Sequence, residues 1–286
     1  MNTISVYTSL ARQLADLFAS LPQVKAIALG GSIMGGVTDQ SSDIDLYVYT
    51  QADIPLVDRQ GIVARSGGAS QENLGMTFWG SGDEWFHAPT GIEVDIVYFE
   101  AQWIENQIQR IIDKHEASLG YTTCLWYIVR NSQVLHDPEE WFQNLQKKAS
   151  TKYPDPLRQK IITLNYPVLR NVIPSYTNQL AKAVKRHDLI SINHRLAALL
   201  ASYFDIIFAL NRELHPGEKK LLNLAQTRCV KLPVDFAGDI TAVIQSSCMA
   251  DQTFLGYLTM LLDHLDQWLE QEGFQTFISN SKPVIE

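Results

Sequence analysis

Two strand-like segments that carry acidic residues at alternate positions restrict the fold more than any other feature of this sequence. Residues 43–50, DIDLYVYT, follow the apolar run VKAIALG at 24–30, and residues 91–100, GIEVDIVYFE, alternate in the same way. Successive side chains of a β-strand point to opposite faces, so Asp43 and Asp45 share one face. The pattern predicts strands with one face in the core and carboxylates on the other.

The remaining patterns predict two domains. Apolar spacing predicts a helix over 3–20, residues 74–91 are predicted as a strand or loop with glycine and proline turns, and QVLHD at 133–137 is a short extended piece. Further helices are predicted at 156–172, 175–186, 188–212, 216–228, 233–247 and 251–272. We therefore predict an α+β domain over residues 1–150, with a small mixed sheet flanked by helices, and an all-α helical bundle over 151–286.

Composition narrows the class of protein. The 286 residues carry a net charge of −8, which argues against long nucleic acid as a partner, because such binders depend on phosphate contacts. The three cysteines, Cys124, Cys229 and Cys248, are far apart and form no CxxC pair, so we expect reduced thiols and no zinc ribbon. The N-terminus does not resemble a signal peptide and no apolar stretch is long enough to span a bilayer. A cytoplasmic protein is expected.

The acidic strands and the glycines that precede the first of them suggest a specific chemistry. Two carboxylates on one strand face repel each other unless a cation lies between them, and Mg²⁺ takes oxygen ligands of this kind together with substrate phosphates. Gly31 and Ser32 follow a buried strand, where a glycine backbone can approach a phosphate closely. Asp95 lies on a later strand. If that strand neighbours the one carrying Asp43 and Asp45, three carboxylates meet beside an anion-binding loop.

These residues resemble the motif of a known superfamily. GGS, ten residues, DID, and a later EVDIV resemble the nucleotidyltransferase superfamily that includes DNA polymerase beta. The resemblance covers about residues 20–100. The layout of a short catalytic domain and a helical bundle is similar to that of aminoglycoside and lincosamide nucleotidyltransferases. Residues 203–222 also look like the helical-domain segment of bacterial relatives.

The resemblance implies a role for each matching residue. Asp43 and Asp45 would hold Mg²⁺, with two ions expected, and Asp95 would be a third ligand, the general base, or both. Gly31 and Ser32 would hold the terminal phosphates of the nucleotide. The implied reaction moves a nucleoside monophosphate, AMP from ATP in the first instance, to a hydroxyl of a small-molecule acceptor and releases pyrophosphate. The acidic charge balance suggests a cationic, aminoglycoside-like acceptor and no long nucleic acid, and the lack of a long apolar stretch suggests no membrane partner.

For several other residues, the sequence is compatible with two different roles. Lys219 is a candidate phosphate clamp from the helical domain, or with Lys220 a solvated basic pair. Asp205, inside an apolar helix, is either an acceptor-side base or the partner of a basic residue. Asn211 either touches the nucleotide or caps the helix, and Glu93 is an alternative to Asp95.

The aromatic residues and histidine near the acidic strands are expected to be structural. Trp79, Trp85 and Phe86 are either a base-stacking group or, as we expect, packing residues, and His87 is expected to be structural.

Two rival functions remain open from the sequence. One is a nucleotide-binding sensor or regulatory module without turnover. The other keeps the chemistry and transfers the nucleotide to a protein or RNA acceptor. Three neighbouring acids have no evident use in an idle site, which favours the enzyme.

Overall fold

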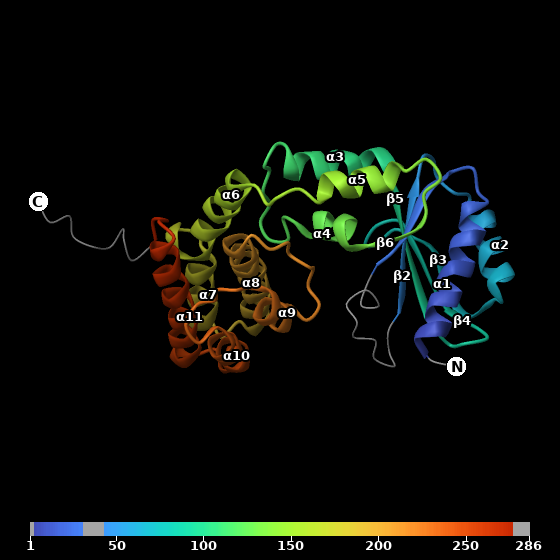
Figure 1. Ribbon diagram of the computed structural model, residues 1–286. Helices are drawn as coiled ribbons and strands as arrows, with labels where there is room; N and C mark the ends of the chain where they lie inside the picture. The colour runs from blue at the N-terminus through green and yellow to red at the C-terminus, as the bar shows by residue number, and fades with distance from the viewer. Residues whose placement is uncertain (1–2, 31–42, 277–286) are drawn as a thin grey trace, which may run out of the picture. The chain divides into compact units, whose positions relative to one another are not determined.

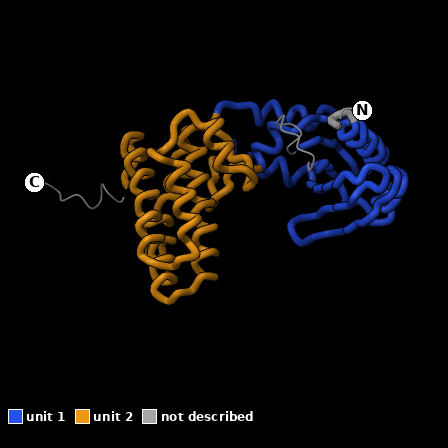
Figure 2. Tube along the Cα trace, turned by 90° about the horizontal axis from the view of Figure 1, so that it is seen from below, with its two compact units in different colours: residues 1–113, 125–152 blue, residues 114–124, 153–286 orange. Residues whose placement is uncertain are grey.

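The computed structural model of the chain describes residues 3–30 and 43–276 (Figure 1). The chain forms two compact units, residues 1–113 with 125–152 and residues 114–124 with 153–286 (Figure 2). The class is mixed α+β, as the sequence predicts. Within the described residues, no helix combines the length and the apolar character needed to cross a membrane.

The first unit is built on a mixed sheet with the strand order β3-β4-β5-β2-β1-β6. The strands are β1 Val24–Leu29, β2 Ile44–Thr50, β3 Ala69–Met76, β4 Gly82–His87, β5 Glu93–Glu100 and β6 Gln133–His136. β2 and β5 run parallel, and each of the other neighbouring pairs is antiparallel. The small mixed sheet predicted from the sequence is confirmed, and the segment QVLHD supplies β6 at its edge.

Helices cover both faces of this sheet (Figure 1). They are α1 Thr3–Ala19, α2 Leu56–Ser66, α3 Ala101–Ile112, α4 Cys124–Asn131 and α5 Trp141–Ala149. α1 and α2 lie on one face, where Leu14 and Phe18 pack against Ile44, Leu46 and Val94 of β2 and β5. Burial of these apolar side chains is the main force that holds the layers together. The acidic residues between them on the strands therefore point to the opposite face.

The opposite face of the sheet has two halves, one covered by helices and one that carries the acidic residues. At the carboxyl end of β2 and β5, the Tyr49 ring stacks on Phe142 of α5 at 4.6 Å between ring centroids, and Phe99 stacks on Trp103 of α3 at 5.7 Å. These aromatic contacts bury one half of the face under α3 and α5. Asp45 and Asp95 lie on the half toward the amino ends of the two strands.

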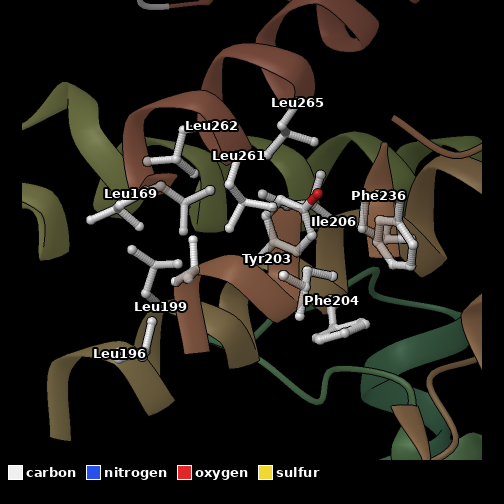
Figure 3. Close-up of a cluster of buried hydrophobic side chains, with 14 of the residues drawn as sticks. Leu169, Leu196, Leu199, Tyr203, Phe204, Ile206, Phe236, Leu261, Leu262 and Leu265 are labelled. Atoms are coloured by element: carbon white, nitrogen blue, oxygen red, sulfur yellow. The ribbon is translucent and has the colours of Figure 1, made fainter. Parts of the chain in front are cut away.

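The second unit is helical. Its elements are α6 Asp155–Tyr166, a π-helical turn Pro167–Asn171, α7 Tyr176–Lys185, α8 Leu189–Asn211, α9 Leu221–Arg228, α10 Phe236–Ser246, a 3₁₀ turn Ser247–Met249 and α11 Gln252–Gln271. α8 runs through the core, where Leu199, Tyr203 and Ile206 pack against Leu261 and Leu265 of α11 (Figure 3). The all-α character predicted for this part of the chain is what the structure shows.

Two helices of this unit differ from the predicted bounds. The helix expected over 156–172 changes to a π-helical turn at Pro167, where the missing N–H removes one α-helical hydrogen bond. The helix expected from residue 216 begins at Leu221. Arg212 and Lys220 have left-handed backbone conformations, with φ of 56° and 57°, so the chain between them turns rather than coils.

The segment 114–124 belongs with the helical unit because polar contacts fix it there. The Gly120 N–H donates to Asn165 Oδ1 at 2.9 Å, and Asn165 Nδ2 donates to the Ser118 carbonyl at 2.9 Å. Asn165 is fully buried on α6, so these bonds form away from water. The domain boundary predicted at residue 150 stays a prediction. The compact units group residues 114–124 with the helical part of the chain, whereas the predicted first domain includes them. Cys124, Cys229 and Cys248 are free thiols.

Candidate functional site

Three carboxylates lie abreast in one transverse row of the sheet. Asp45 of β2 and Asp95 of β5 are register partners across the parallel pair, and Glu84 of β4 is the antiparallel partner of Asp95. The row continues to Gly30 at the end of β1, whose N–H donates to the Asp45 carbonyl at 2.9 Å. Side chains directly opposite one another on neighbouring strands share a face and have Cβ atoms about 5 Å apart. The row therefore gathers negative charge at one place on the sheet.

A second pair of acids extends this charge by one step along the strands. Ile44 is in register with Val94, which sets Asp43 beside Glu93. The pKa of the Glu93 carboxyl is raised, first by its hydrogen bond with Glu84, then by burial and by the charges of Glu84, Asp43 and Asp95. The acids of the two rows thus act on one another, as like charges held close together do.

The Tyr47 side chain borders the same row. It follows Asp45 by two positions on β2 and so lies on the same face. The pKa of the Tyr47 hydroxyl is raised, first by burial and then by the charges of Asp45, Asp95 and Asp43, with Tyr127 of α4 as a smaller cause. The hydroxyl therefore stays protonated beside the carboxylates.

The predicted site residues have different outcomes. Asp45 and Asp95 are brought together, and Asp43 lies one residue before β2, beside Glu93. Gly31 and Ser32 lie outside the described residues. Lys219 belongs to the helical unit and is exposed in the turn before α9. Their roles in metal and phosphate binding stay predictions.

Sequence reasoning did not find Glu84 and Tyr47. Glu84 lies in the segment whose structure the sequence left open, and its pairing with Asp95 depends on the register of a hairpin. Tyr47 matches the strand pattern, but its importance depends on a contact with Gly30 that no spacing rule indicates. The acidic alternation around Asp95 was the available signal for looking at its neighbours.

The row has the ligand chemistry of a divalent-cation site. Carboxylate oxygens are hard ligands, and Mg²⁺ is commonly held by one or two carboxylates that act together with substrate phosphates. Asp45 and Asp95 supply two such groups on adjacent, hydrogen-bonded strands. Among residues 3–30 and 43–276, no three His, Cys, Asp or Glu side chains already form a group that would hold a metal. Asp43, beside Glu93, is a further candidate ligand.

Asp205 has a different environment from either that was expected. Its side chain is 1% exposed. It accepts hydrogen bonds from the Thr122 N–H at 3.1 Å, the Thr122 hydroxyl at 2.6 Å and Asn165 Nδ2 at 3.4 Å. Burial raises the pKa of Asp205 to about 7, and the two bonds from Thr122 act in the opposite direction. Asp205 therefore anchors the 114–124 segment through a hydroxyl and amides rather than pairing with a basic residue.

Asn211 and His87 both make hydrogen bonds to backbone groups. Asn211 exchanges two hydrogen bonds with the backbone of Lys231, both 2.9 Å long, and so ties the end of α8 to a later loop. Nε2 of the buried His87 lies 2.9 Å from the Ser66 carbonyl, and its Nδ1 lies 2.7 Å from the Thr90 hydroxyl. The structural role expected for His87 matches these contacts.

The aromatic residues near the site do not form one group. Trp85 is 2% exposed and packs in the core on the α1 side of the sheet. Trp79 is 92% exposed next to Phe78 in the β3–β4 turn. The packing role expected for these residues is therefore confirmed for Trp85. Trp79 is too exposed to be a packing residue.

Comparison with known proteins adds little to this picture. A family model described as a domain of unknown function (DUF4037) matches residues 122–221. No curated protein matches the chain. Among solved structures, the chain is similar to the crystal structure of a nucleotidyltransferase-like protein from Exiguobacterium sibiricum 255-15. The two are 11% identical with a TM-score of 0.41, over 93% of this chain and 80% of that one. The similarity is distant and assigns no activity.

Proposed function

We propose that the chain is a metal-dependent nucleotidyltransferase that moves a nucleoside monophosphate, AMP from ATP in the first instance, to a hydroxyl of a small molecule. The observation that carries the proposal is the register pairing of Asp45 with Asp95, with Glu84 next in the same row. Carboxylates held abreast on rigid strands are suited to positioning a cation and a triphosphate. The sequence motif around these residues is independent support for the same chemistry.

The aspartates of the site have separate roles in this proposal. Bound Mg²⁺ would neutralise and orient the triphosphate, which is the main requirement of phosphoryl-group chemistry. Asp45 and Asp95 would hold the cation, with Asp43 as a further ligand. The acceptor oxygen forms a bond to the α-phosphorus while the bond from that phosphorus to pyrophosphate breaks. Asp95 would take the proton that the acceptor hydroxyl loses.

The phosphate-binding residues and the second cation are proposed from the sequence alone. Gly31 and Ser32 would bind the terminal phosphates, and Lys219 would contribute a cation to them. A second Mg²⁺ would share the same carboxylates. Glu84 and Glu93 add negative charge next to Asp95, which favours an acceptor that carries amines. An aminoglycoside-like compound has that chemistry.

The direct test is a search for the acceptor. Purified protein is incubated with Mg²⁺, labelled ATP and a panel of antibiotics and metabolites, and both pyrophosphate and product mass are measured. We expect pyrophosphate release with at least one acceptor, a mass increase of one nucleoside monophosphate, and loss of both signals with a chelator. ATP binding with no pyrophosphate for any small molecule, protein or RNA acceptor would favour the sensor function instead.

A further inference from the structure

Tyr47 occupies the position at the head of the carboxylate row. The row runs Gly30, Asp45, Asp95, Glu84, and Gly30 has no side chain to place there. A Cβ atom added to Gly30 would lie 2.2 Å from Tyr47 Cε2, 2.8 Å from Cζ and 2.9 Å from the hydroxyl oxygen. The ring therefore lies directly on the Gly30 backbone, and its hydroxyl stands where the next side chain of the row would be.

Glycine at position 30 leaves the space that the Tyr47 ring occupies. Real Cβ atoms do not approach other heavy atoms to 2.2 Å, so any other residue would displace the ring. The ring also packs against Phe99, at 5.9 Å between centroids. The Tyr47 hydroxyl is thus fixed by packing, next to Asp45 on its own strand. The Tyr47 hydroxyl is a hydrogen-bond donor on the carboxylate face of the strand, where the charges of Asp45, Asp95 and Asp43 act on it.

We infer that Tyr47 is a positioning residue that orients the carboxylates of the row, Asp45 first, for cation binding. The inference rests on the proposed function, which supplies the cation. Groups that orient the ligands of a metal typically contribute 10- to 100-fold to metal affinity or activity. The position of Tyr47 beside Gly30 and Asp45 matches such a group, since it touches the row without being one of the carboxylates.

Mn²⁺ binding in the absence of nucleotide tests the inference, with free Mn²⁺ followed by electron paramagnetic resonance. The full chain is compared with Tyr47→Phe, which removes only the hydroxyl, and with Asp45→Asn. Tyr49→Phe is the matched control, because Tyr49 lies on the same strand and face. Its buried hydroxyl makes no hydrogen bond to any residue that the structure describes. Thermal unfolding of each variant is measured alongside.

We expect Tyr47→Phe to weaken Mn²⁺ binding by about 10- to 100-fold at an unchanged melting temperature, and Tyr49→Phe to bind as the unmodified chain does. Gly30→Ala is the second variant, because it moves the hydroxyl without deleting it, and it should weaken binding similarly. Asp45-dependent binding that Tyr47→Phe and Gly30→Ala both leave unchanged would overturn the inference and leave the proposed function standing. Binding that Asp45→Asn does not alter would overturn the metal site itself.

Discussion

Asp205 on α8 accepts two hydrogen bonds from Thr122, one from the backbone N–H at 3.1 Å and one from the hydroxyl at 2.6 Å. The two residues are 83 positions apart in the chain, and the bonds fix the 114–124 segment onto the helical unit. A carboxyl that is 1% exposed must obtain its hydrogen bonds from the protein, because water does not reach it. We expect this buried group to make the stability of the protein depend on pH.

We predict that Asp205 makes the protein less stable as the pH rises from about 4 to about 7. Burial raises the pKa of Asp205 to about 7 in the folded state, above the value of about 3.9 for an unfolded chain. Between these values the folded state binds one more proton than the unfolded state. The free energy of unfolding should therefore fall by up to about 1.4 kcal/mol per pH unit from this group.

Urea unfolding at a series of pH values measures this effect. Asp205→Asn keeps the shape of the side chain and removes the titration, so the difference between the two proteins isolates Asp205 from the other acids. The difference should change across the window from about pH 4 to 7 and be constant above it. Parallel curves for the two proteins would show that Asp205 does not titrate there.

The buried ion pair of the first unit gives a second prediction. Asp83, 1% exposed, pairs with Arg59 at 2.9 Å and also accepts hydrogen bonds from the Gly75 N–H and the Tyr98 hydroxyl, at 2.7 and 2.6 Å. Asp83→Ala removes the acceptor of the partly buried Arg59 and Tyr98 side chains and of the Gly75 N–H. We expect a loss of about 3–5 kcal/mol in the free energy of unfolding, measured by urea denaturation.

A surface ion pair of the same unit serves as the control for Asp83. Asp113 pairs with Lys148 at 2.6 Å, and both side chains are more than 40% exposed. Asp113→Ala should cost less than about 1 kcal/mol, since water and salt screen exposed pairs. Equal losses for Asp83→Ala and Asp113→Ala would mean that burial does not set the strength of these pairs.

The two tryptophans of the β3–β4 region should respond very differently to truncation. Trp85→Ala removes a core side chain and should cost about 3–5 kcal/mol of stability. Trp79→Ala removes a side chain that is 92% exposed and should change stability by less than about 0.5 kcal/mol. Thermal or urea unfolding of both variants decides this. A large loss for Trp79→Ala would show a contact that the described structure lacks.

Much of the sheet and of the site could be predicted because the signals are local. Alternation along 43–50 and 91–100 fixes which residues share a face, so the spacing alone assigns Asp45 and Asp95 to the polar faces of their strands. Whether the two strands are neighbours, and in what register, depends on how the chain crosses between them. That information is spread over the core residues of the sheet and cannot be read from either segment.

The elements that were missed have weak local patterns. β3, Ala69–Met76, is mostly exposed and shows no alternation, so neither it nor the pairing of Glu84 in β4 could be derived. α2, Leu56–Ser66, contains Gly61 and buries few side chains, which weakens its helical pattern. The contact of Tyr47 with Gly30 is tertiary and leaves no trace in residue spacing.

If Asp45 and Asp95 together support metal-dependent transfer, the rate of pyrophosphate release should fall when either one is replaced. With ATP, Mg²⁺ and an active acceptor, Asp45→Asn and Asp95→Asn should each release pyrophosphate ~10³-fold more slowly or worse. Both variants should unfold at the temperature of the unmodified chain. Glu72→Gln, an exposed acid on β3, should keep full activity. Full activity in both Asp45→Asn and Asp95→Asn would contradict the account.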